Sequence, residues 1–103
     1  MPNFVRIAAV SELAPGDRLV VEIDGRWIAL FNIDGEFHAI ADICTHDDGP
    51  LAEGELYDHV IECPRHGATF DVRTGEVLSF PAITPIPSYE VKIEGDDVLV
   101  ALE

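Results

Sequence analysis

The sequence predicts a small all-β domain, and three observations support that fold class. Short apolar segments recur along the chain, two Asp-Gly pairs separate such segments, and no stretch of ten residues or more has a clean helical period. Asp-Gly between two apolar runs is a strong signal for a tight hairpin. A chain of 103 residues has the size of one domain, so we expect residues 1–103 to form a single unit.

The first forty residues are expected to form four strands. Residues 4–7 alternate and predict a first strand, and residues 11–13 predict a short helical turn that ends at Pro15-Gly16. Three further strands follow, joined by Asp24-Gly25 and Asp34-Gly35 into an antiparallel meander. They cover residues 19–23, 27–33 and 36–40.

The rest of the chain predicts shorter elements. We expect strands at 59–62 and 68–71, a turn at 73–76, a proline-rich stretch at Pro81, Pro85 and Pro87, and a closing hairpin of 89–94 with 98–102. Trp27 and Phe31 are expected in the core.

Composition excludes several classes of protein. Twenty acidic residues against six basic ones give a net charge of −14, which nucleic acid and anionic membranes would repel. No apolar run approaches the length of a membrane span, and the N-terminus does not resemble a signal peptide. Two cysteines in such a chain indicate a reducing compartment, so we expect a cytoplasmic protein. The acidity could serve solubility or could steer the chain towards a basic docking site, and the sequence leaves both open.

Both cysteines and two of the four histidines lie in one stretch. It reads Cys44-Thr45-His46, then sixteen residues, then Cys63-Pro64-Arg65-His66. Clusters of Cys and His at short spacings usually hold a metal. Zinc fingers usually separate the ligands by type, whereas here each half carries one sulfur and one nitrogen ligand.

This arrangement suits a centre of two irons with different ligands, in which each loop sends its Cys to one iron and its His to the other. Two neutral imidazoles in place of two thiolates make such a centre less negative. It is then easier to reduce, so its potential rises. A structural zinc site made from the same four side chains is the main alternative.

Through these motifs the chain resembles the Rieske-type ferredoxins, from about residue 19 to its C-terminus. Besides Cys44-Thr45-His46 and Cys63-Pro64-Arg65-His66-Gly67, the matching residues are Leu51, Gly54, Phe70-Asp71, Thr74-Gly75, Pro81-Ala82 and Tyr89. The resemblance implies an antiparallel β-sandwich or barrel with two cluster-binding loops, at about 41–50 and 63–70. It also implies that the proline-rich stretch packs beside these loops.

The resemblance further implies one [2Fe–2S] cluster, with Cys44 and Cys63 on the buried iron and His46 and His66 on the outer iron. Its function would be electron transfer, without catalysis, from a flavin-dependent reductase to a ring-hydroxylating oxygenase. Docking would be transient and the chain a monomer. Quinol-oxidising relatives carry an extra Cys in each loop for a disulfide, and this chain has only two Cys.

Other functions remain as alternatives: a catalytic oxygenase, which its length disfavours, or a redox subunit or sensor of another complex. Arg65 could dock a partner, tune the cluster or be merely solvated. His38 and His59 are interpreted as ordinary surface or core histidines. With Asp58 they could supply the residue types of a mononuclear iron site, but their spacing does not favour it.

Overall fold

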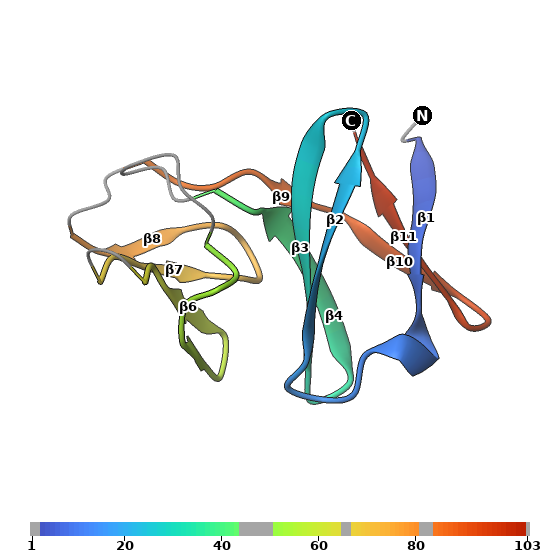
Figure 1. The fold of residues 1–103 in the computed structure, drawn as a ribbon, viewed down its shortest axis with the longest axis horizontal. Coiled ribbons are helices and arrows are strands. Elements are labelled where there is room, and N and C mark those ends of the chain that lie inside the picture. The colour runs from blue at the N-terminus through green and yellow to red at the C-terminus, as the bar shows by residue number, and fades with distance from the viewer. Residues whose placement is uncertain (1–2, 44–50, 65–66, 81–83, 103) are drawn as a thin grey trace.

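The computed structural model describes residues 3–43, 51–64, 67–80 and 84–102, and over these residues it is an all-β protein. Its strands form three antiparallel sheets, which lie side by side in Figure 1. The predicted fold class is therefore confirmed. Within the described ranges, no helix has the length and apolar character needed to cross a bilayer.

The central sheet contains the predicted meander. It is built from β2 (Arg18–Ile23), β3 (Arg26–Ile33), β4 (Glu36–Ala41) and the short β9 (Ser88–Tyr89), in that order. Both Asp-Gly pairs form two-residue turns, with Asp24 and Asp34 at φ 52° and 54°. Positive φ at both turn residues is what a type I′ hairpin requires.

The terminal sheet packs on one face of the central sheet. It consists of β1 (Phe4–Ala9), β11 (Asp97–Ala101) and β10 (Val91–Glu94), with β11 in the middle, and a 3-10 turn, η1 (Val10–Glu12), follows β1. Pairing of β1 with β11 joins the two ends of the chain in one sheet (Figure 1).

The loop-bearing sheet packs on the opposite face and has the shortest strands. Its order is β5 (Leu56–Tyr57), β6 (Val60–Glu62), β7 (Thr69–Asp71) and β8 (Val77–Ser79). It follows residues 44–50 in sequence and contains the hairpin from which Cys63 extends.

Strand β3 is shared by two cores, because its side chains alternate between the two faces of the central sheet. Ala29, Phe31 and Ile33 pack towards the loop-bearing sheet, while Ile28 and Leu30 pack towards the terminal sheet. A strand buried on both faces is expected to be a nearly continuous apolar run, as residues 28–33 are.

Four details differ from the sequence predictions. Trp27 is 55% exposed, because it lies beside the first hairpin turn, beyond the buried part of β3. Asp58 and His59 form a two-residue turn between β5 and β6, so β6 begins one residue later than predicted. The predicted strand 89–94 is divided at Glu90 between β9 and β10, which belong to different sheets. β5 and β8 were not predicted.

Candidate functional site

Cys63 directly follows β6, and the backbone after it turns back sharply. The Cys63 amide donates to Ala68 O at 2.7 Å and the Gly67 amide donates to Cys63 O at 3.1 Å. Gly67 has φ 78°, the left-handed conformation that glycine adopts at no steric cost. These two bonds fix both ends of the second predicted cluster loop.

The side chain of Cys63 is buried at 1% exposure and makes no disulfide. It belongs to the core between the central and loop-bearing sheets, together with Leu51, Ile61 and Phe70. Ile86, from the proline-rich stretch, lies in the same core, as the family resemblance implied for this segment. A buried cysteine is either an inert core residue or a ligand, and its position beside a short tight loop suits a ligand.

The first predicted loop is anchored at both of its ends by Asp42. Oδ1 of Asp42 accepts hydrogen bonds from the Leu51 amide at 2.9 Å and the Ala52 amide at 2.7 Å. Charge-assisted bonds of this kind are stronger than neutral ones. Asp42 therefore holds the residues that precede and follow segment 44–50 close together.

Arg18, on the central sheet, holds the residues that follow the same segment. Its Nη1 donates to Ala52 O at 2.7 Å and to Gly54 O at 2.5 Å. Neither Arg18 nor Asp42 was predicted from the sequence as a site residue. The only sequence signal for Asp42 is its place two residues before Cys44, and Arg18 has none, because it lies more than thirty residues from its acceptors.

The turn between β7 and β8 is closed by an ion pair. Oδ1 of Asp71 accepts from the Arg73 amide at 2.8 Å, and Nη2 of Arg73 lies 2.9 Å from Oδ2. The side-chain hydrogen bond from Arg73 lowers the pKa of Asp71, against the opposing effect of burial. Asp71 is thus held ionised, and its backbone oxygen also accepts from the Gly75 amide.

Of the four predicted ligands the structure describes only Cys63. Cys44, His46 and His66 lie outside the described residues, as do Arg65 and Pro81-Ala82. The predicted convergence of two sulfurs and two imidazoles therefore stays a prediction. The described surroundings fit such a centre: one loop has a buried free thiol at its start and the other has both ends fixed by Asp42.

Two other histidines, by contrast, are brought together. The rings of His38 and His59 are 6.1 Å apart between centroids and lie edge to face. The carboxylate of Glu36 lies near both rings, and Oδ1 of Asp58 lies 3.4 Å from Nδ1 of His59.

Comparison with known proteins identifies the domain. The family model of the Rieske [2Fe-2S] domain matches residues 3–90. The chain is 47% identical over 100 residues to the ferredoxin component of biphenyl 2,3-dioxygenase from Rhodococcus jostii (strain RHA1), covering 97% of this chain and 94% of that protein.

Solved structures agree. The ferredoxin of carbazole 1,9a-dioxygenase from Nocardioides aromaticivorans IC177 superposes with a TM-score of 0.92 at 32% identity, covering 97% of this chain and 98% of that one. A chain from a complex of reduced oxygenase and oxidized ferredoxin in carbazole 1,9a-dioxygenase superposes with a TM-score of 0.90 at 36% identity, covering 95% and 92%.

The domain match supplies the cofactor class. The chain covers nearly the whole of the ferredoxins but only 30% of the terminal oxygenase of carbazole 1,9a-dioxygenase from Nocardioides aromaticivorans IC177, which separates a carrier from the longer catalytic subunits. The chain therefore belongs to the Rieske [2Fe-2S] family, as a ferredoxin that carries electrons rather than a catalyst.

Proposed function

We propose that this ferredoxin takes electrons from a flavin-dependent reductase and delivers them to a ring-hydroxylating oxygenase. The observation that carries the proposal is similarity to ferredoxin components of aromatic dioxygenases over nearly the whole of both chains. One similar chain was solved together with its oxygenase, which supports transient docking to such a partner.

The cluster would be held by Cys44 and Cys63 on its inner iron and by His46 and His66 on its outer iron. When bound, it supplies one electron that can be accepted and released reversibly. The described residues support this assignment at Cys63, whose burial suits the inner position. Residues 1–103 would act as one domain and as a monomer in the cytoplasm, with cluster loops at about 41–50 and 63–70.

The chain's own contribution would be to fix the ends of each of the two loops. Asp42 and Arg18 fix the first loop, and the Cys63–Ala68 and Gly67–Cys63 backbone bonds fix the second. A rigid site reorganises little when the charge of its cofactor changes, because its ligands and hydrogen bonds are already in position.

Docking would be assisted by charge. A net charge of −14 favours encounter with a basic surface, and a redox encounter typically buries less than about 1,200 Å². Because the Debye length is about 8 Å at physiological ionic strength, the association rate should fall as salt is added.

The decisive experiment is reconstitution with a purified biphenyl-type oxygenase and a flavoprotein reductase. Anaerobically purified ferredoxin should contain about two iron and two acid-labile sulfide per chain. Adding it should raise substrate hydroxylation many-fold over the oxygenase and reductase alone. The second-order rate of oxygenase reduction should decrease with salt.

Two results would contradict the proposal. One zinc and no sulfide in the native protein would overturn the cluster assignment. A cluster-loaded protein that reduces no such oxygenase, but serves another enzyme complex, would support the alternative of a different redox subunit.

A further inference from the structure

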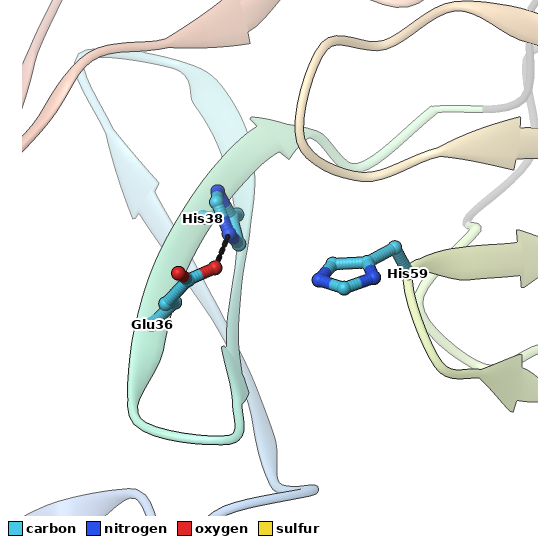
Figure 2. A group of neighbouring side chains, drawn as sticks. All are labelled: Glu36, His38 and His59. Carbon is cyan, nitrogen blue, oxygen red and sulfur yellow. Dashed lines mark hydrogen bonds and ion pairs between the residues drawn. The ribbon is translucent and has the colours of Figure 1, made fainter.

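Three metal-ligating side chains converge on the side of β4 that faces the loop-bearing sheet. Figure 2 shows Glu36 and His38 on β4 and the ring of His59 pointing towards them from the β5–β6 turn. One ligand atom from each residue can be chosen so that all three lie within 4.8 Å of one another. None of the three belongs to the proposed cluster site.

The distances are close to those of a metal site. Two ligands on a tetrahedral zinc are about 3.3 Å apart, as Zn–N and Zn–O bonds of about 2.0–2.1 Å require. Nε2 of His38 and Oε1 of Glu36 are already 3.4 Å apart. The three ligand atoms lie within 4.8 Å of one another. Small rotations of the side chains would bring all three to the spacing of metal ligands.

The second nitrogen of His59 also lies near a carboxylate, the kind of partner that a ligand histidine usually has. Nδ1 of His59 lies 3.4 Å from Oδ1 of Asp58. Ligand imidazoles commonly donate their other N–H to a carboxylate, which fixes the tautomer and orients the ring. Asp58 can therefore orient His59 while its opposite edge faces His38 and Glu36 (Figure 2).

The surrounding charge is negative overall. The guanidinium of Arg73 interacts with Glu36 and Asp58 and would oppose a cation, but it is paired with Asp71. Three carboxylates thus act electrostatically on one guanidinium, and only Asp71 contacts it directly. The side chains of His38 and His59 are 22% and 23% exposed, so an ion can enter and retain water as a further ligand.

We propose that Glu36, His38 and His59 form a second metal site, for a late first-row divalent cation such as Zn²⁺, that joins the central sheet to the loop-bearing sheet. Two imidazoles and one carboxylate suit such ions better than Mg²⁺ or Ca²⁺, which prefer oxygen ligands. Because β4 and the β5–β6 turn belong to different sheets, the bound ion would cross-link them and stabilise their packing.

The test is calorimetric titration of ZnCl₂ into cluster-loaded protein, with MgCl₂ as a comparison. The wild type should bind one Zn²⁺ per chain and should bind Mg²⁺ far more weakly. Loss of an orienting partner lowers metal affinity by about 10–100-fold, so Asp58→Asn should weaken binding by about tenfold or more. His38→Gln and His59→Gln remove ligands and should weaken it by at least about 100-fold.

A matched control variant and a check of folding make the result specific. Glu22→Gln removes one carboxylate from an exposed position on β2 and should leave the affinity unchanged, whereas Glu36→Gln should lower it. Asn tolerates the left-handed conformation of Asp58, at φ 57°, so Asp58→Asn keeps the turn. Iron content and circular dichroism would verify that each variant is folded and loaded.

The proposal is overturned if the wild type shows no saturable Zn²⁺ site, or if a His38→Gln/His59→Gln double variant binds Zn²⁺ as tightly. Zinc uptake that releases iron in step would assign the zinc to the cluster ligands and would also overturn it. If a histidine variant fails to fold, the test becomes an NMR titration of the wild-type protein, in which the imidazole resonances are followed. Addition of Zn²⁺ should then shift those of both His38 and His59.

Discussion

The two outer sheets flank the same central sheet but are held in different ways. The terminal sheet has strands of four to six residues, which pair along their length except at an irregularity in β1 between Arg6 and Ala8. A tight turn at Gly95-Asp96 joins two of these strands. The loop-bearing sheet has strands of two or three residues. It depends on side chains that reach distant backbone groups, above all Arg18 and Asp42.

The difference separates a self-sufficient scaffold from a unit that needs tethers. Long paired strands satisfy their own backbone groups, while strands of two or three residues gain little from pairing alone. A cofactor held between two loops would therefore contribute most to the loop-bearing sheet, because metal binding and folding are coupled. Selective damage to one sheet is the way to test this comparison.

The largest effect is expected from Cys63→Ser. The variant should lose the cluster, and hydrogen exchange should become much faster at β6 and β7, because both the proposed ligand and its packing at 1% exposure are altered. Amides of β10 and β11 should keep most of their protection. Iron analysis and amide exchange measured by NMR or mass spectrometry would check both statements.

Equal loss of protection in the terminal and loop-bearing sheets would contradict the comparison. It would mean that the chain unfolds as one cooperative unit, with no separately stable scaffold. Retention of a full iron and sulfide complement would instead remove Cys63 from the ligand set.

The same contrast explains which parts of the fold could be predicted. The central meander follows from Asp24-Gly25 and Asp34-Gly35, whose turn chemistry is local, and the structure confirms it. The family resemblance also implied a loop at about 63–70, and the structure has a tight turn there with Gly67 at positive φ. The family resemblance supplied the antiparallel all-β fold class, expected as a sandwich or barrel, and the cofactor.

What the sequence did not reveal depends on tertiary contacts. The turn at Asp58-His59 lacks glycine, and β5 has only two residues, so neither gives a clear local signal. The break at Glu90 separates two strands that read as one apolar alternation. The approach of His38 to His59 is set by packing between sheets, which spacing along the chain cannot encode.

A second test compares two glycines at positive φ. A Cβ on Gly75, at φ 81°, would lie 1.8 Å from Ile86 O, whereas one on Gly95, at φ 61°, meets nothing within 4 Å. We expect Gly75→Ala to cost about 3–5 kcal/mol, since backbone of the loop-bearing unit must move. Gly95→Ala should cost only the left-handed penalty, about 1–2 kcal/mol. Urea unfolding followed by circular dichroism would measure both.

Equal losses in the two alanine variants would contradict the close approach of Gly75 to Ile86. Such a result would also mean that the proline-rich stretch does not pack tightly against the β7–β8 turn.

A smaller effect is expected from Arg18→Lys. The lysine keeps the charge but cannot place a guanidinium N–H between Ala52 O and Gly54 O, so about 1.5–3 kcal/mol should be lost. Arg26→Lys is the matched control, because Arg26 donates to Leu102 O beside the terminal sheet. We expect a smaller loss there, since the terminal sheet is secured by its strand pairing. A larger loss from Arg26→Lys, measured by urea unfolding, would reverse the comparison.

The smallest effect is expected in how the free energy of unfolding depends on pH when one of two ion pairs is removed. Asp71 in the loop-bearing sheet has a side chain only 12% exposed, and the Arg73 hydrogen bond lowers its pKa. A depressed folded-state pKa adds stability above the unfolded value of about 3.9, and this stability is lost as pH falls through the folded pKa. Asp71→Asn should thus be less stable than wild type near neutral pH, and the gap should close below about pH 4.

The comparison variant for this pH test is Asp97→Asn in the terminal sheet. It breaks the Arg6–Asp97 pair, whose side chains are 55% and 52% exposed. Solvent-exposed pairs contribute little, because water and salt screen them. Its stability difference from wild type should therefore be small and change little with pH. If urea unfolding from pH 3 to 7 gave the two asparagine variants the same pH profile, the Asp71–Arg73 pair would be an ordinary surface contact. The turn between β7 and β8 would then depend on its backbone bonds and on the packing of Gly75 against Ile86.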